Sequence, residues 1–208
     1  LSTNNLGPQL PCAPRSRPRT LHPTRENRLE VLGLRDGGVN GVVRSLGALL
    51  DDAQLAALLD AVRGETVTHI LVTHSHADHS PLARRLQQVT GAITMAYGAV
   101  EAPPSAGLRL DASIDHDFEP DQRLAESDCV SGPGWTLEAL FTPGHMSNHM
   151  CFALKEEKAL FAGDHVMAWA TSVIAPPDGD MGQYFASLRK LLDRDDHEGT
   201  QRGHGHQT

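Results

Sequence analysis

Residues 66–80, which read T-V-T-H-I-L-V-T-H-S-H-A-D-H-S, decide the fold of this chain. The first half, residues 66–73, is rich in β-branched side chains and largely apolar, as a buried strand should be. The histidines begin where this strand is expected to end. Ser80 is followed by Pro81, which is favoured in the first turn of a helix. The stretch therefore predicts a strand, a histidine-rich loop and a helix.

The loop contains four metal-binding side chains within six residues, in the pattern H-x-H-x-D-H from His74 to His79. Side chains at positions i and i+2 of an extended segment face the same way, so His74 and His76 can hold one ion. The turn that follows directs Asp78 and His79 toward a second ion. The alternative is a run of solvent-facing polar residues, but the density of ligand types favours two adjacent metal sites.

Two later strands also end in metal-binding residues. The strand expected at 135–141 precedes Thr142-Pro143-Gly144-His145, and that at 159–162 precedes Gly163-Asp164-His165. A metal ion needs four or more donors, and one loop cannot surround it. We therefore expect His145 and Asp164 to be ligands, although each alone is compatible with an ordinary loop residue.

Periodicity and turn residues predict the other elements. Helices are expected near residues 51–63, 80–91 and 184–192, and strands at 92–97, 135–141, 149–154 and 159–162. The last helix is expected to bury an apolar side formed by Tyr184, Phe185, Leu188, Leu191 and Leu192. Residues 101–128 are polar and contain proline, which predicts a long surface excursion. Residues 29–46 predict two short strands around a glycine-rich turn, and the proline-rich residues 1–27 predict an irregular arm.

Composition limits the classes of function. The chain has 208 residues, which suits one domain, and a formal net charge of −8 with 18 Lys and Arg. An acidic chain argues against a broad nucleic-acid surface, so a small-molecule substrate is favoured over RNA. The three cysteines have no disulfide or zinc-binding spacing, and no apolar run is long enough to span a bilayer. We expect a cytoplasmic protein, without a membrane partner, whose 12 histidines are its distinguishing feature.

Several other histidines have open roles. His149 is equally compatible with contact to substrate or a ligand and with stabilising its own loop, and His165 with lining the pocket and with packing. His69, within the first strand, is expected to be structural.

The motifs T-H-S-H-A-D-H, T-P-G-H, G-D-H and a late G-H-G resemble those of the metallo-β-lactamase superfamily. The similarity covers about residues 50–196, with His204 added, and is greatest to small bacterial hydrolases of the β-lactamase-like protein 2 group. It implies an α+β fold, the four-layer αββα sandwich with metals at one edge. It also implies that residues 49–208 form this domain, truncated at the C-terminus, and that residues 1–48 are an atypical N-terminal segment.

The resemblance implies a role for each ligand. The first of two Zn²⁺ ions would be bound by His74, His76 and His145, and the second by Asp78, His79 and His204, with Asp164 bridging both. Asp78 would also be catalytic, because it would orient the attacking water. Mn²⁺ or Fe²⁺ can occupy such mixed nitrogen and oxygen sites. The polar residues around His204 leave His206, or water, as alternatives for the last ligand.

The implied reaction is hydrolysis by a metal-bound hydroxide of a small-molecule ester, thioester or lactone. A metal-dependent ribonuclease or phosphodiesterase and a β-lactam hydrolase are alternatives. A fourth is an inactive metal-binding remnant, because the family's N-terminal strands are not legible before residue 49 and a C-terminal helical extension is missing.

Overall fold

The structure is a computed structural model that describes residues 40–43, 52–100, 114–167, 171–194 and 200–201.

The N-terminal half forms a parallel sheet covered by two helices. Its four strands lie in the order β1-β2-β3-β4, and each is parallel to its neighbour. They are β1 (Asn40–Val43), β2 (Val67–Leu71), β3 (Ile93–Ala96) and β4 (Gln122–Arg123). The helices α1 (Asp52–Ala61) and α2 (Ser80–Thr90) connect successive strands. Crossover helices of this kind are what parallel pairing requires.

The C-terminal half forms a second, mainly antiparallel sheet in the order β5-β6-β7-β8-β9, in which only β9 is parallel to its neighbour. Its strands are β5 (Cys129–Gly132), β6 (Trp135–Phe141), β7 (Met150–Leu154), β8 (Ala159–Phe161) and β9 (Thr200–Gln201). Short 3₁₀ turns at Lys155–Glu157 and Gly163–His165 flank β8, and α3 (Met181–Leu192) follows.

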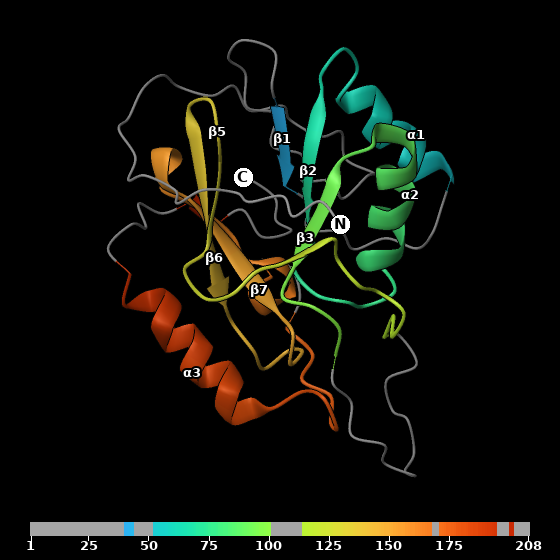
Figure 1. Ribbon diagram of the computed structural model, residues 1–208. Helices are drawn as coiled ribbons and strands as arrows, with labels where there is room; N and C mark the ends of the chain where they lie inside the picture. Colours follow the sequence, from blue (N-terminus) through green and yellow to red (C-terminus); the bar gives the residue numbers. More distant parts are fainter. Residues whose placement is uncertain (1–39, 44–51, 101–113, 168–170, 195–199, 202–208) are drawn as a thin grey trace, which may run out of the picture.

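Three apolar clusters hold these elements in four layers. The largest lies between the sheets, where Leu71 and Met95 of the first sheet meet Trp135, Phe152 and Phe161 of the second. A second cluster packs α1 and α2 on the parallel sheet, and a third packs α3 on the antiparallel sheet. Figure 1 shows α1 and α2 on one side, the sheets in the middle and α3 on the other. The expected αββα sandwich is confirmed.

Some sequence-based expectations about elements were wrong. Part of the expected surface excursion belongs to the sandwich, because β4 pairs with β3 and the flanking side chains Phe118 and Leu124 are buried. Helix α3 begins at Met181, earlier than expected. Of the apolar side expected on α3, Leu191 is buried, but Phe185 is 52% and Leu192 76% exposed. The expectations for residues 1–27 and 29–39 lie outside the described residues. The domain boundary expected at residue 49 stays a prediction.

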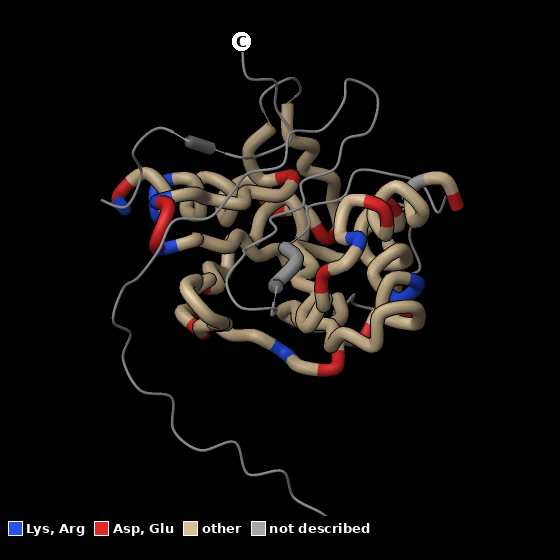
Figure 2. The backbone as a smooth tube through the Cα atoms, turned by 90° about the horizontal axis from the view of Figure 1, so that it is seen from above, with Lys and Arg blue, Asp and Glu red and all other residues tan. Residues whose placement is uncertain are grey.

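Charged residues surround the described part of the chain without segregating by sign. Lys and Arg are interspersed with Asp and Glu around its periphery (Figure 2). Within the described residues, no helix combines the length and apolar character needed to cross a bilayer.

Candidate metal centre

The carboxyl ends of three strands lie at one edge of the sandwich. The backbone N–H of Met150, where β7 begins, donates to the carbonyl of Thr73, just beyond β2, at 2.8 Å. Because β6 and β8 are both antiparallel to β7, they end where β7 begins. The loops after β2, β6 and β8 therefore meet there, as expected from the sequence, and they carry the histidines and Asp164.

Three imidazole nitrogens converge at this edge. His76 Nδ1 lies 3.0 Å from His74 Nε2 and 3.1 Å from His145 Nε2. The three rings are buried, with His76 9% and His145 7% exposed. Nitrogens about 2.0–2.1 Å from one tetrahedral Zn²⁺ lie about 3.3 Å apart, so the observed separations fit a shared ion with a small adjustment. The three side chains thus form a group able to hold a metal.

Hydrogen bonds on the far side of the rings orient these nitrogens. His145 Nδ1 lies 2.5 Å from the carbonyl oxygen of Val173, which can only accept. Nδ1 must therefore carry the proton, and in the neutral ring Nε2 presents its lone pair to the shared point. His74 Nδ1 is likewise 3.0 Å from Thr73 Oγ1.

Electrostatics keep the rings of His74 and His145 in the form that binds metal. Burial first, and then repulsion from His79 and His145, hold the pKa of His74 well below its usual range. Burial and the neighbouring His76 also lower the pKa of His145, and this effect outweighs the opposing effects of the Val173 carbonyl and Asp164. A ring that stays neutral near pH 7 offers a lone pair without competition from a proton.

A second group adjoins the first. His74, His79 and Asp164 each place a ligand atom within 4.8 Å of the others. Asp164 Oδ2 lies 3.5 Å from His79 Nε2 and 3.9 Å from His145 Nε2, between the two groups. Asp78 Oδ2 is 3.7 Å from His79 Nε2, and the Asp78 side chain is 40% exposed. The Asp78 carboxylate therefore lies at the solvent-facing rim of the centre.

Of the remaining histidines of interest, His149 and His165 are buried behind the centre, whereas His69 is half-buried and lies elsewhere. The ring of His149 is fully buried, with Nδ1 2.9 Å from Thr142 Oγ1, and packs against His74 with centroids 5.1 Å apart. Substrate cannot reach this ring, so a supporting role remains for His149. His165 is also fully buried and packs on Tyr184, with centroids 4.6 Å apart. His69 contacts the edge of Trp135 from within β2, away from the centre, with centroids 6.2 Å apart.

Supporting residues that sequence reasoning missed hold the histidine loop in place. The Asp115 carboxylate accepts hydrogen bonds from Ser80 Oγ at 2.8 Å and from Arg84 at 2.7 Å, while the Asp115 N–H donates to the Ser75 carbonyl. Asp115 carries no motif, and only the observation that the histidine loop needs anchoring could have suggested such a residue. The expected ligand His204 and its competitor His206 lie outside the described residues.

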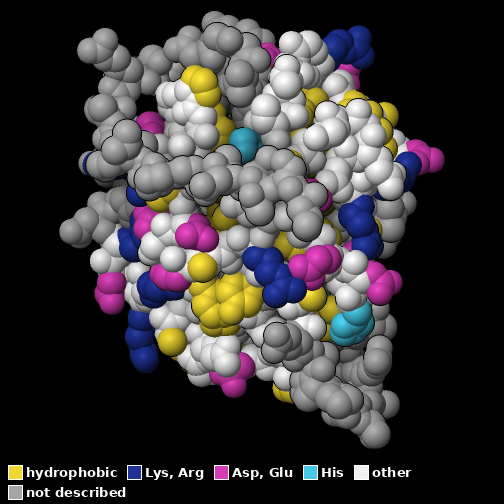
Figure 3. Space-filling model, viewed as in Figure 1, with side chains coloured by type: hydrophobic (Ala, Val, Ile, Leu, Met, Phe, Trp, Pro, Cys, Tyr) yellow, Lys and Arg dark blue, Asp and Glu magenta, His cyan; other side chains and the backbone are white. Residues whose placement is uncertain are grey.

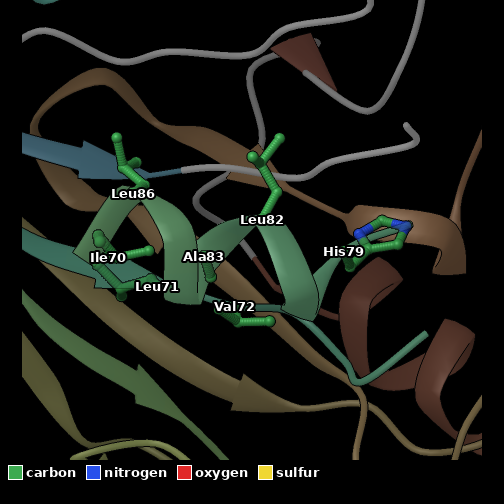
Figure 4. A pocket seen from close by; sticks show the side chains of 7 residues that line it. All are labelled: Ile70, Leu71, Val72, His79, Leu82, Ala83 and Leu86. Carbon is green, nitrogen blue, oxygen red and sulfur yellow. The ribbon is translucent and has the colours of Figure 1, made fainter. Parts of the chain in front are cut away.

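A small pocket lies behind the second group, between α2 and the parallel sheet. His79 lies at one end of this pocket, just before α2 begins (Figure 4). The other lining residues are apolar: Ile70, Leu71, Val72, Leu82, Ala83 and Leu86. An apolar wall behind His79 lowers the local dielectric and excludes water from that side of its ring.

The sequence matches the family model described as the metallo-beta-lactamase superfamily over residues 46–198. An atrochrysone carboxyl ACP thioesterase from Claviceps purpurea is 30% identical over 213 residues, covering 92% of this chain and 58% of that protein. The lactamase-like protein adaB from Aspergillus niger is 33% identical, covering 62% of this chain and 35% of that protein. The chain spans between 32% and 58% of the length of eight curated relatives that it matches.

Solved structures share the architecture. A crystal structure of TTHA1623 in a di-iron-bound form is 25% identical, with a TM-score of 0.63 and coverage of 93% of both chains. The metallo-beta-lactamase family protein TTHA1429 from Thermus thermophilus is 23% identical, with a TM-score of 0.62 and coverage of 82% of this chain and 67% of that one.

Proposed function

The chain belongs to the metallo-beta-lactamase superfamily, and from that membership we propose that it is a binuclear metal-dependent hydrolase that cleaves a small-molecule thioester. One observation carries the proposal: imidazole nitrogens from two sheets converge beside the Asp164 carboxylate, at hydrogen-bonding distances from His76 Nδ1. The narrower assignment to the β-lactamase-like protein 2 group and the cytoplasmic location stay predictions.

The donor set suits two divalent ions. His74, His76 and His145 would hold one, and Asp78, His79 and Asp164 the other, with Asp164 shared and His204 as a further donor. Two ions at these positions would supply Lewis acidity toward a carbonyl group and would lower the pKa of water. We propose zinc, because imidazoles with a few carboxylates suit it. Iron is the specific alternative, because the structurally similar TTHA1623 was solved in a di-iron-bound form.

The chain's own side chains divide the remaining work. The buried rings of His74 and His145 stay neutral and fixed, so they need little reorganisation during the reaction. The exposed rim at Asp78 leaves room for substrate, and its carboxylate can accept a proton from the attacking water. Attack at the thioester carbonyl carbon breaks the C–S bond and releases a carboxylic acid and a thiol. A thiol of pKa about 8.5 leaves as the thiolate without a strong acid.

The names of the relatives favour thioesters among possible substrates. The chain is 30–35% identical to several proteins named as ACP thioesterases, although it spans only part of their length. An RNA substrate is less well supported, because the described basic side chains on the face seen in Figure 3 lie among acidic ones.

The test is a metal-controlled substrate comparison. The protein loaded with Zn²⁺ is assayed with acyl thioesters of N-acetylcysteamine, the matching oxygen esters, a β-lactam and a short RNA. We expect hydrolysis of the thioesters to be fastest, to stop when a chelator removes the metal, and to return with Zn²⁺. Bound metal is counted in parallel, with about two ions expected per chain.

Each other outcome corrects a stated part of the proposal. Turnover that survives complete metal removal would exclude a metal-dependent reaction. Preference for the β-lactam or RNA would replace the thioester, and two irons in the purified protein would replace zinc. Stoichiometric metal without turnover of any substrate would support the inactive metal-binding alternative.

A further inference from the structure

Asn148 makes a buried connection that the proposed reaction does not use. Its side chain is 3% exposed, and its Nδ2 donates to Ser75 Oγ at 3.0 Å and to the Gly98 carbonyl at 2.8 Å. A carbonyl oxygen can only accept, so the atom that faces Gly98 must be the amide nitrogen. Both N–H groups of one amide are therefore committed to two different loops.

The two acceptors belong to the parallel sheet, whereas Asn148 follows β6 of the antiparallel sheet. Ser75 lies between His74 and His76, and Gly98 lies in the loop after β3. Asn148 itself follows His145 in the same short loop before β7. One side chain thus spans the gap between the sheets at the edge where the imidazole nitrogens of His76 and His145 come within 3.1 Å.

We infer that Asn148 is a positioning residue that sets the separation of the two histidine loops and thereby the affinity of the centre for metal. The inference rests on the proposed metal-dependent function. A residue that bonds both Ser75 and Gly98 requires two N–H donors at the end of a short side chain. Aspartate has the same shape but no N–H, and it would set a carboxylate oxygen against the Gly98 carbonyl. Glutamine is one methylene longer, and the site is buried, so its amide would have to shift away from the two acceptors.

The fold does not depend on Asn148 alone. The Met150 N–H still joins β7 to Thr73 at 2.8 Å, and the core between the sheets holds the two layers together. Loss of the Asn148 amide should therefore loosen the loops at the metal edge while the sandwich remains folded. This separates a positioning role from a general contribution to stability.

The experiment measures metal affinity and does not depend on activity. Zn²⁺ binding to the wild type, Asn148→Ala and Asn148→Asp is titrated in competition with a chromogenic chelator. We expect both variants to bind about 10- to 100-fold more weakly, the range for residues that support a ligand. In the metal-free proteins, we expect hydrogen exchange to accelerate in the loops at 74–80 and 143–149 and to stay unchanged in β6.

Two further variants make the result decisive. Ser75→Ala removes one of the two acceptors and leaves the bond to Gly98, so we expect a loss of about two- to tenfold. This variant tests the positioning role if the Asn148 variants fail to fold. Val130→Ala is the control. It disturbs the core between the sheets at a residue that pairs with Leu137, inside β6, and should leave Zn²⁺ affinity at the wild-type value.

The outcomes separate this inference from the proposed function. A wild-type protein that binds no divalent metal would overturn the proposed function. A wild type that binds Zn²⁺, together with folded Asn148 and Ser75 variants of equal affinity and equal loop exchange, would overturn the positioning role alone. An equal loss of affinity in Val130→Ala would also overturn it, because any loss of stability would then have the same effect.

Discussion

The two sheets contribute to the candidate centre in different ways. The parallel sheet presents His74, His76, Asp78 and His79 from one loop, directly after β2. The antiparallel sheet contributes single side chains from separate strand ends, His145 after β6 and Asp164 after β8. The first set is assembled by local chain geometry, and the second becomes useful only when the two sheets pack correctly. A centre of this kind is therefore sensitive to whatever aligns the sheets.

The largest expected effect follows from removing one histidine from each side. His76→Ala and His145→Ala should each lower kcat/KM for the best substrate by more than about 100-fold, because loss of a ligand exceeds the usual loss from its supporting residues. Metal content should fall in both variants. Equal losses would show that the sheet supplying a single histidine matters as much as the loop supplying three.

The matched control for these variants is His69→Gln. His69 lies in β2 but contacts Trp135, away from the centre, so its kcat/KM and metal content should stay at wild-type values. Wild-type turnover in His76→Ala or His145→Ala would remove that ligand from the proposed mechanism.

A second test targets the glycine that places the His145 loop against α3. Gly144 has φ of +138°, and a Cβ there would lie 2.3 Å from the backbone of Tyr184. Gly144→Ala should lower the free energy of unfolding by about 3 kcal/mol or more, since backbone strain and overpacking add. Chemical denaturation measures this loss.

Alanine substitutions at Gly163 and Gly91 provide the comparison for the stability loss expected in Gly144→Ala. A Cβ on Gly163, with φ of +53°, would lie 2.7 Å from His149 Nε2, a less severe overlap than the 2.3 Å approach to backbone at Gly144. At Gly91, with φ of +72°, nothing lies within 4 Å, so Gly91→Ala should cost only about 1–2 kcal/mol. The expected order of loss is Gly144, Gly163, Gly91. A loss at Gly91 as large as that at Gly144 would refute contact with α3 as the cause.

The same contrast explains what could be predicted from the sequence. Helix α2 agrees with its expected range nearly to the residue, because burial on one face leaves a repeating signal. Strand β6 has the expected range because turn residues bound a largely apolar run. The strand ends then indicated which side chains would gather, and the structure brings His74, His76 and His145 together and sets His79 beside Asp164. Their roles as metal ligands stay predictions.

What could not be predicted depends on tertiary contacts. β4 has only two residues, both exposed, and forms because β3 offers it an unpaired edge. The apolar stripe on α3 was misjudged because helical periodicity does not say which of several apolar residues faces the sheet. Asn148, Asp115 and the backbone carbonyl of Val173 support the site through a few hydrogen bonds between residues far apart in the sequence. Isolated residues of this kind leave no local pattern in a sequence.

A smaller effect is expected from removing Asp115, whose hydrogen bonds hold the histidine loop of the parallel sheet in place. Asp115→Ala leaves Ser80 and Arg84 without their common acceptor, which should cost about 1–3 kcal/mol of unfolding free energy. Asp52→Ala is the control, because its ion pair with Arg85 is exposed and should contribute no more than about 1 kcal/mol. Equal losses in the two variants would contradict a role for Asp115 in holding the histidine loop.

The smallest expected effect concerns Cys151 in β7, at the centre of the antiparallel sheet. Burial raises the pKa of this thiol from 9.0 to about 12, against the smaller opposing effect of its contact with Thr142. The folded protein therefore retains a proton that the unfolded chain loses above pH 9. The stability that this thiol contributes is complete below pH 9 and is lost as the pH rises toward 12.

Cys151→Ala should remove this pH dependence. Between about pH 7 and 9.5 the wild type should lose about 0.8 kcal/mol more unfolding free energy than the variant, whatever the packing cost of the substitution. Leu154→Val, in the same strand, carries no titrating group, so its stability curve should run parallel to that of the wild type. Parallel curves for the wild type and Cys151→Ala would mean that water reaches β7 in the folded state. The antiparallel sheet would then be too loose to hold His145 and Asp164 in register with the histidine loop.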